Sequence, residues 1–160
     1  MNTPERLQKL VAEAGLLLGS SSLRLDEQGG CALEFDKQIV VSLQYRQETD
    51  LLCLYTDLGP APMRSAQFHE KLLQANFFWQ ATVGSTFSLS GDEPPHIILA
   101  HPVQWSSMDL SSFNTALLTF IDSVEVWHQH LKHMTFGGAT KEAIDVRGHD
   151  MPEGILRSLA

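Results

Sequence analysis

Three histidines in the last third of the chain have the spacing that comes nearest to a metal site. Ligands on one helix must lie three or four residues apart so that both side chains reach the same ion. Glu125 and His128 satisfy this rule, as do His130 and His133, but His128 and His130 point about 200° apart on a helix. Near a helix C-terminus, imidazolium groups also complement the helix dipole, and we favour this explanation. A small metal-dependent enzyme that uses the His128–His133 cluster remains an unfavoured alternative.

Other groups with catalytic potential do not form a catalytic arrangement in the sequence. The acidic pairs Asp26-Glu27 and Asp92-Glu93 occur at turns, where water solvates them, so acid–base catalysis is not expected. Cys31 and Cys53 lie in apolar stretches without a CxxC spacing and are expected to be reduced core thiols. The sequence contains no phosphate-binding glycine motif and no GxSxG motif. We therefore predict no catalytic residues, no cofactor, no metal and no enzymatic activity.

Composition indicates one compact, acidic domain with a protein partner. The chain has 160 residues, of which 43% are hydrophobic, so it can form a core. Eleven Lys and Arg residues against nineteen Asp and Glu residues give a net charge of −8. Such a surface repels nucleic acids and anionic membranes. The N-terminus has no apolar signal core, and the sequence contains no apolar stretch of membrane-spanning length, so we expect a cytoplasmic protein without membrane insertion.

Apolar spacing predicts an element order of α-β-β-β-α-β-β-α. Thr3 is the expected N-cap of the first helix, with Pro4 at its first position and Gly15 at its end. Alternating residues predict the strands, and a 3, 4 repeat predicts the last helix. The expected ranges after the first helix are strands at 31–35, 39–45 and 51–56, a helix at 62–79, strands at 84–90 and 96–101, and a helix from about 109 to 134.

This order predicts an α+β domain in which helices pack on a mainly antiparallel, twisted sheet. The domain is expected to cover residues 1–134. Residues 135–160 lack a regular apolar pattern and are expected to form a flexible or weakly docked tail.

The expected helix at 62–79 is apolar around so much of its circumference that one sheet cannot cover it. A twofold-related second copy is the simplest cover, so we predict a homodimer. The predicted interface residues are Phe68, Leu72, Leu73, Asn76, Phe77 and Trp79.

The sequence resembles the class I type III secretion chaperones of the Tir chaperone (CesT-like) family over about residues 3–134. Four stretches and a closing-helix segment carry the resemblance, and their order and spacing match the family. They are Leu23-Arg24-Leu25-Asp26, Leu52-Cys53-Leu54-Tyr55-Thr56-Asp57-Leu58-Gly59, Leu72-Leu73-Gln74-Ala75-Asn76-Phe77-Phe78-Trp79, Gly84-Ser85-Thr86-Phe87-Ser88-Leu89 and Glu125-Val126-Trp127.

The resemblance implies binding without chemistry. Chaperones of this family hold the extended N-terminal segment of a secreted effector, keep it soluble and secretion-competent, and deliver it to the secretion apparatus and its ATPase, which makes the chain a virulence-related protein. In the family the segment adds a strand to the sheet and inserts apolar side chains into grooves near the first helix. The corresponding candidate effector-binding residues are Leu7, Leu10, Val11, Leu33, Phe35, Val41 and Leu43, although core packing explains the same residues.

A second function with the same fold remains open. The protein would then be a regulatory partner-binding protein that sequesters a regulator of secretion genes. The sequence does not separate this function from that of an effector chaperone.

Overall fold

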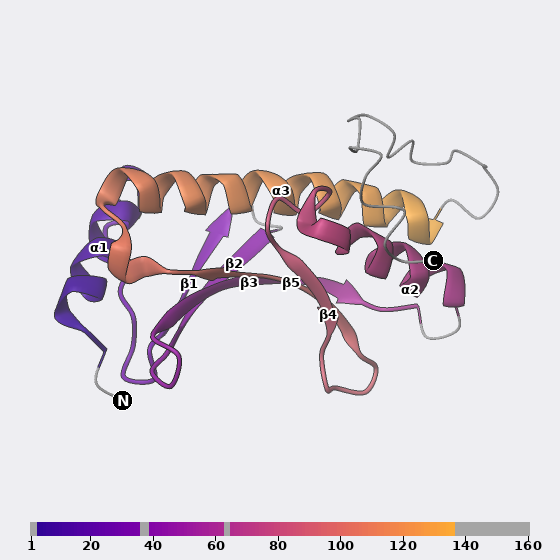
Figure 1. Cartoon of the computed structure of the whole chain (residues 1–160), viewed down its shortest axis with the longest axis horizontal. Helices are drawn as coiled ribbons and strands as arrows, with labels where there is room; N and C mark the ends of the chain where they lie inside the picture. The colour runs from indigo at the N-terminus through magenta and orange to yellow at the C-terminus, as the bar shows by residue number, and fades with distance from the viewer. Residues whose placement is uncertain (1–2, 36–38, 63–64, 137–160) are drawn as a thin grey trace, which may run out of the picture.

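A computed structural model describes residues 3–35, 39–62 and 65–136, and side chains up to residue 133. Five antiparallel strands form one twisted sheet in the order β1-β2-β3-β5-β4, and the helices cover one of its faces (Figure 1). The predicted α-β-β-β-α-β-β-α order and α+β class are confirmed. The elements are α1 (Glu5–Leu17), β1 (Gly30–Phe35), β2 (Ile39–Arg46), β3 (Leu51–Pro60), α2 (Ala66–Ala75), the 3-10 turn η1 (Phe77–Trp79), β4 (Thr86–Leu89), β5 (His96–Val103), the 3-10 turn η2 (Trp105–Ser107) and α3 (Leu110–Phe136).

The sheet is apolar on the face that the helices cover. In β2 every second residue is buried, and in β3 the buried residues are Leu52, Leu54 and Thr56. The register places Leu43 beside Leu54, and Phe87 of β4 beside Leu99 of β5. Alternation along a strand therefore sends one set of side chains into the core, while the opposite face carries more exposed residues.

Helix α1 differs from its prediction at both ends. Pro4, with φ −56° and ψ 133°, occupies the N-cap position that we assigned to Thr3, and no side chain caps the helix. The helix continues past Gly15 to Leu17. A Cβ atom at Gly15 would lie 2.6 Å from the Cβ of Leu23, so this glycine permits close packing and does not end the helix.

Helix α2 is shorter than the predicted helix at 62–79. Ser65 precedes it, and its side chain accepts a 3.2 Å hydrogen bond from the Phe68 backbone N–H. At the other end Phe78 has φ 49°, in the left-handed region, which interrupts the helical path. The apolar spacing continues past the end of α2, so the sequence did not show where the helix ends.

Helix α3 lies across the sheet and confirms the predicted apolar seam (Figure 1). Of the predicted seam residues, Leu110 is half-buried, and Phe113, Leu117, Phe120, Val124, Trp127 and Leu131 are buried. Asp109 precedes the helix and accepts a 2.8 Å hydrogen bond from the Ser112 N–H. Hydrogen bonds from Ser112 also hold the pKa of Asp109 below its ordinary value. The helix ends at Phe136 and so crosses the expected boundary at 134, while residues 137–160 of the expected tail lie outside the described residues.

Strands β1 and β2 are each one residue longer than predicted, β3 and β5 extend further, and β4 is shorter. Strand β3 continues to Pro60 and β5 to Val103 because Leu52 pairs with Val103 and Pro60 with His96. Strand β4 covers only Thr86–Leu89, because the residues before it form a turn that accepts hydrogen bonds from Ser123 and Trp127 of α3.

Candidate partner-binding surface

A cluster of exposed apolar side chains surrounds α2, η1 and β4. Leu73 exposes 70% of its surface and Phe77 exposes 60%, although both are large hydrophobic residues. Monomeric soluble proteins rarely expose contiguous apolar patches beyond a few hundred Å². We call this set the α2–β4 apolar surface, and its members are Leu73, Phe77, Phe78, Trp79, Val83 and Leu89.

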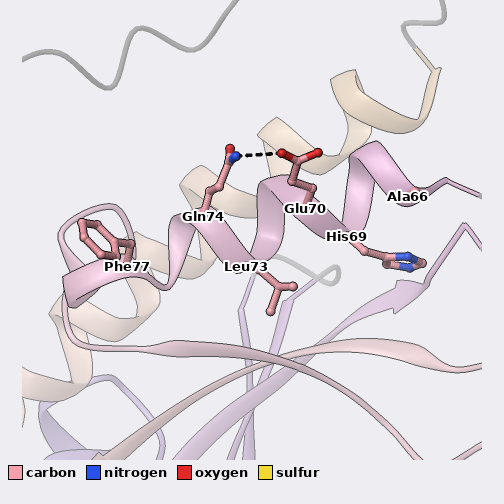
Figure 2. A pocket seen from close by; sticks show the side chains of 6 residues that line it. All are labelled: Ala66, His69, Glu70, Leu73, Gln74 and Phe77. Carbon is pink, nitrogen blue, oxygen red and sulfur yellow. Dashed lines mark hydrogen bonds between the residues drawn. The ribbon is translucent and has the colours of Figure 1, made fainter. Parts of the chain in front are cut away.

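Two adjoining grooves follow this surface. One has a volume of about 840 Å³ and is lined by Ala66, His69, Glu70, Leu73, Gln74 and Phe77. Figure 2 shows its polar side, where the Gln74 amide donates a 3.2 Å hydrogen bond to Glu70, while Leu73 points away from these two side chains. The second groove, of about 160 Å³, runs between α2 and β4 and shares His69 and Leu73 with the first. Mixed polar and apolar lining of this kind suits a protein partner.

The turn after α2 holds its aromatic side chains in a strained backbone. Phe78, Trp79 and Val83 all have positive φ, between 49° and 54°, which costs energy for residues other than glycine. Side-chain hydrogen bonds stabilise this conformation. The Trp79 indole donates to the Thr86 hydroxyl at 2.9 Å, and the Trp127 indole of α3 donates to the Ala81 carbonyl at 3.0 Å. The exposed aromatic rings are thus presented on an anchored turn.

The residues predicted for the dimer interface fall into two groups. Leu73, Phe77 and Trp79 belong to the α2–β4 apolar surface, whereas Phe68 and Leu72 are 4% and 5% exposed and pack into the core of their own chain. Asn76 is half-buried, and its side-chain amide donates to the Phe87 carbonyl and accepts from the Phe87 N–H. Phe78, Val83 and Leu89 are exposed but were not among the predicted interface residues, because their exposure depends on the turn conformation and on where the sheet ends.

The candidate effector-binding residues lie in the core. Six of them are buried, between 0% and 7% exposed, and Phe35 is half-buried, so they do not line an open groove in this structure. Other apolar residues of the same elements are accessible: Leu16 and Leu17 at the end of α1 are each 62% exposed, and Val40 of β2 is 48% exposed. Apolar spacing identified the correct elements without separating their buried residues from their exposed ones. The six buried residues of the predicted effector-binding set are Leu7, Leu10, Val11, Leu33, Val41 and Leu43.

Strand β1 lies at one edge of the sheet and has an accessible backbone. It pairs only with β2 within the sheet, from Gly30 beside Gln44 to Phe35 beside Ile39. Ala32 and Glu34 are exposed. An unpaired strand edge offers N–H and C=O groups to a further strand, so β1 can accept an extended segment of another polypeptide.

The histidine cluster does not converge in the part of the chain that the structure describes. His128 is half-buried, His130 and His133 are exposed, and no group of three possible metal ligands gathers among the described residues. The ring of His130 instead lies 5.8 Å from the indole of Trp127. Burial lowers the pKa of His128, and the positive charge of Lys132 adds to this effect.

Both cysteines are free thiols whose charged form is disfavoured. Burial, with a smaller contribution from the Asp26 carboxylate, raises the pKa of Cys31 to about 12. Burial also raises the pKa of Cys53, against the opposing effects of Arg46 and of a backbone hydrogen bond at His101. Neither thiol has the lowered pKa of a nucleophilic cysteine.

Comparison with known proteins identifies the family of this chain. The chain belongs to the Tir chaperone protein (CesT) family, whose profile matches residues 9–128. The transcriptional anti-antiactivator ExsC of Pseudomonas aeruginosa is 26% identical over 132 residues, which cover 82% of this chain and 89% of that protein.

Solved structures show the same fold. The ExsC–ExsE complex contains a chain with a TM-score of 0.68 and 25% identity, over 81% of this chain and 96% of that one. The Yersinia pestis type III secretion chaperone SycH, in complex with a fragment of YscM2, has a TM-score of 0.58 and 21% identity, over 74% and 97% of the two chains. The protein is thus a type III secretion chaperone by family. No helix within the described residues has the length and apolar character needed to cross a membrane.

Proposed function

We propose that this protein binds the extended N-terminal segment of a secreted type III effector in the cytoplasm and keeps that segment soluble and secretion-competent. The function requires binding surfaces and no reaction, so we propose that the chain is not an enzyme and uses no cofactor. Delivery to the secretion ATPase belongs to the same proposal. The single observation that carries it is the family match over residues 9–128.

Two surface features support this function in physical terms. The edge of β1 provides backbone hydrogen-bonding groups, which bind an extended chain whatever its sequence. Exposed apolar area is also present at Leu16 and Leu17, at the end of α1, and at Val40 of β2, the strand that pairs with β1, and apolar side chains of a partner can pack against it. Ordering an extended segment costs several kcal/mol, roughly 2–5, so a chaperone of this kind needs an extensive contact.

We further propose that the protein acts as a homodimer through the α2–β4 apolar surface. A second copy supplies apolar area of matching chemistry, because a twofold axis brings the same surface together twice. Leu73, Phe77 and Leu89 line or adjoin the two grooves and are the central contacts of this proposal.

A regulatory function is the second candidate, and a specific comparison favours it. The relative that matches over 132 residues is called a transcriptional anti-antiactivator, and its structure was solved as a complex with ExsE. In this case the partner is a regulator of secretion genes, and the chain controls transcription by sequestering it. The same surfaces serve both functions.

The test is to purify the tagged full-length protein from its native bacterium under secretion-inducing conditions and to identify co-purifying proteins by mass spectrometry. Each partner is then co-expressed with the chain as the full protein, as its N-terminal segment alone and without that segment. The proposal expects the N-terminal segment to be necessary and sufficient for co-purification. Binding through a folded domain only, or no partner at all, contradicts it.

Deleting the gene separates the two candidates. For an effector chaperone, the effector becomes insoluble or is not secreted, whereas transcription of secretion genes stays unchanged. For a regulator, transcription changes and recovers when the sequestered partner is deleted as well.

A further inference from the structure

The α2–β4 apolar surface lies beside the last turns of α3. The Trp127 ring of α3 packs on Phe87 of β4, with 4.7 Å between the ring centroids, and its indole donates to the turn that follows α2. Helix α3 ends at Phe136, nine residues further on, which is about 14 Å along the helix axis at 1.5 Å per residue. The chain therefore continues from a point close to this surface.

The groove between α2 and β4 is the part of this surface best suited to further side chains. The six large hydrophobic residues of the surface are between 46% and 70% exposed in the single chain. The groove has a volume of about 160 Å³, and four of its seven lining residues are apolar, namely Leu72, Leu73, Phe87 and Leu89. It is too small for a folded domain. Its apolar lining favours a short segment rich in aliphatic residues.

Residues 155–159 form the densest apolar stretch in the sequence after α3. Three of these five residues have large aliphatic side chains: Ile155, Leu156 and Leu159. The eighteen residues before them, 137–154, include only Ile144, Val146 and Met151 as large apolar residues. A chain spans at most about 3.3–3.6 Å per residue, so nineteen residues cover up to about 60 Å. The segment at 155–159 can therefore reach any part of the α2–β4 apolar surface.

The charges of the segment and the surface are also complementary. Arg157 lies between the aliphatic residues of the segment, and the larger groove along α2 has the exposed carboxylate of Glu70 on its polar side. Figure 2 shows this carboxylate and Leu73 on the same helix, pointing in different directions. The two grooves share Leu73, so a segment whose aliphatic side chains fill the smaller groove has its basic group near the larger one.

We propose that residues 155–159 cover the α2–β4 apolar surface while the chain is monomeric, and that a second copy must displace them before the dimer forms. The aliphatic side chains of the segment occupy the groove between α2 and β4, and Arg157 pairs with Glu70. The segment thereby sets the protein concentration at which the dimer assembles. This inference rests on the proposed dimer and adds its regulation by the same chain.

A tether makes even a weak contact effective against a second copy. A short tether gives an effective concentration of about 1 mM. A contact with an intrinsic Kd of about 0.1 mM then favours the covered surface about tenfold, and it weakens the binding of another chain by the same factor. Because a twofold dimer displaces one segment from each copy, the two factors multiply to about a hundredfold.

The first test compares the dimer Kd of full-length variants by analytical ultracentrifugation over a dilution series. Leu156→Glu is expected to tighten the dimer at least tenfold, because a charged segment no longer covers the groove. Ile144→Glu changes the charge equally outside the segment and is expected to change the Kd less than threefold. Equal effects of the two substitutions overturn the proposal. A weaker dimer in Leu156→Glu places the segment between the two copies and also overturns it.

The second test locates the segment with a nitroxide label attached at Ser158→Cys, in a full-length chain that also carries Cys31→Ser and Cys53→Ser. The label is expected to broaden the NMR amide signals of Leu73 and Leu89 and to leave Ala32 unchanged. The broadening is expected to increase on dilution, because dimerisation displaces the segment. Broadening that is absent from Leu73 and Leu89, or that decreases on dilution, overturns the proposal.

Mixing and charge exchange refine this test. When the spin-labelled chain is mixed with an isotope-labelled chain that has no nitroxide, broadening within one chain disappears from the isotope signals, whereas persistent broadening shows a contact between copies and overturns the proposal. Arg157→Glu is expected to reduce the broadening at Leu73 at least twofold, and Glu70→Arg in the same chain is expected to restore it. Glu70 is exposed on α2, so both variants should fold. No restoration overturns the pairing of Arg157 with Glu70.

The outcomes distinguish this inference from the proposed dimer. If the unmodified chain and Leu156→Glu both stay monomeric at every concentration, the dimer proposal fails and its regulation fails with it, while broadening at Leu73 still supports the covered surface. If the dimer forms with the same Kd in both chains and Leu73 is not broadened, the dimer proposal stands and this inference is overturned.

Discussion

The indole of Trp105 donates a 3.2 Å hydrogen bond to the carboxylate of Asp50, which lies 55 residues earlier in the chain. The Tyr45 hydroxyl donates to the same oxygen at 3.0 Å. Above the indole, the Arg6 guanidinium lies 5.8 Å from the ring centroid and donates to the Ser106 and Met108 carbonyls. One acidic residue thus joins the β2–β3 turn to η2 and, through Trp105, to α1.

We expect Asp50→Ala to lower the free energy of unfolding by about 1–3 kcal/mol, because Tyr45 and Trp105 are buried and lose their shared acceptor. Asp50 also has φ 52°, a conformation that alanine adopts poorly. Asp50→Asn keeps an acceptor oxygen and tolerates this φ, so we expect a smaller loss. Urea unfolding curves measure both, and equal losses for the two variants contradict this explanation.

The proposed dimer predicts a mass of twice 17.8 kDa by light scattering. Leu73→Glu or Phe77→Glu places a charge in the α2–β4 apolar surface and is expected to weaken dimerisation by at least about a hundredfold, since burying an unpaired charge costs several kcal/mol. Because both side chains are exposed in the single chain, the variants should remain folded.

Leu118→Glu is the matched control for this surface. Leu118 is 40% exposed on α3 and lies outside the α2–β4 apolar surface, so its substitution should leave the dimer intact. A dimer that survives Leu73→Glu and Phe77→Glu has its interface elsewhere. A protein that is monomeric at all concentrations contradicts the dimer proposal itself.

Because His101 is partly buried, we expect the folded protein to lose stability at acid pH. Burial lowers the pKa of His101 below its ordinary 6.5, although a backbone hydrogen bond with Gly84 opposes the shift. Below about pH 6.5 the unfolded chain therefore binds a proton that the folded chain does not, and the stability present at higher pH is lost as pH falls toward the folded pKa. Urea unfolding at pH 7.5 and pH 5.5 should show a smaller acid loss for His101→Asn than for the unmodified protein.

His133→Asn is the control for this measurement, because His133 is exposed on α3. We expect its acid loss to be no smaller than that of the unmodified protein. If His101→Asn also behaves like the unmodified protein, burial of the imidazole does not contribute to the pH dependence.

The two thiols should differ in reactivity. The pKa of Cys31 rises from 9.0 to about 12, so its thiolate fraction at pH 8 falls by roughly a thousandfold, partly offset by the greater nucleophilicity of a more basic thiolate. Burial raises the pKa of Cys53 as well, but Arg46 and a backbone hydrogen bond at His101 oppose that shift, so iodoacetamide should alkylate Cys53 faster than Cys31. Mass spectrometry of Cys31→Ser and Cys53→Ser resolves the two rates, and faster reaction at Cys31 contradicts the prediction.

Local patterns in the sequence account for most of the fold. Alternation and 3, 4 spacing predicted all five strands and all three helices, because both patterns follow from which face of an element meets the core. The ends of the elements were less predictable. Gly15 was expected to end α1, but its role is the close contact with Leu23, a residue eight positions away whose location depends on the tertiary structure.

The sequence by itself determined the element order, the acidic charge and the family resemblance, since all three depend on residues read in order. Tertiary structure decided which apolar residues remain accessible. Leu72 and Leu73 are adjacent and chemically identical, yet one is 5% and the other 70% exposed, because only one faces the sheet. It also brought Asn76 beside Phe87, because the left-handed residue Phe78 ends the helical path between them, and apolar spacing does not encode this conformation.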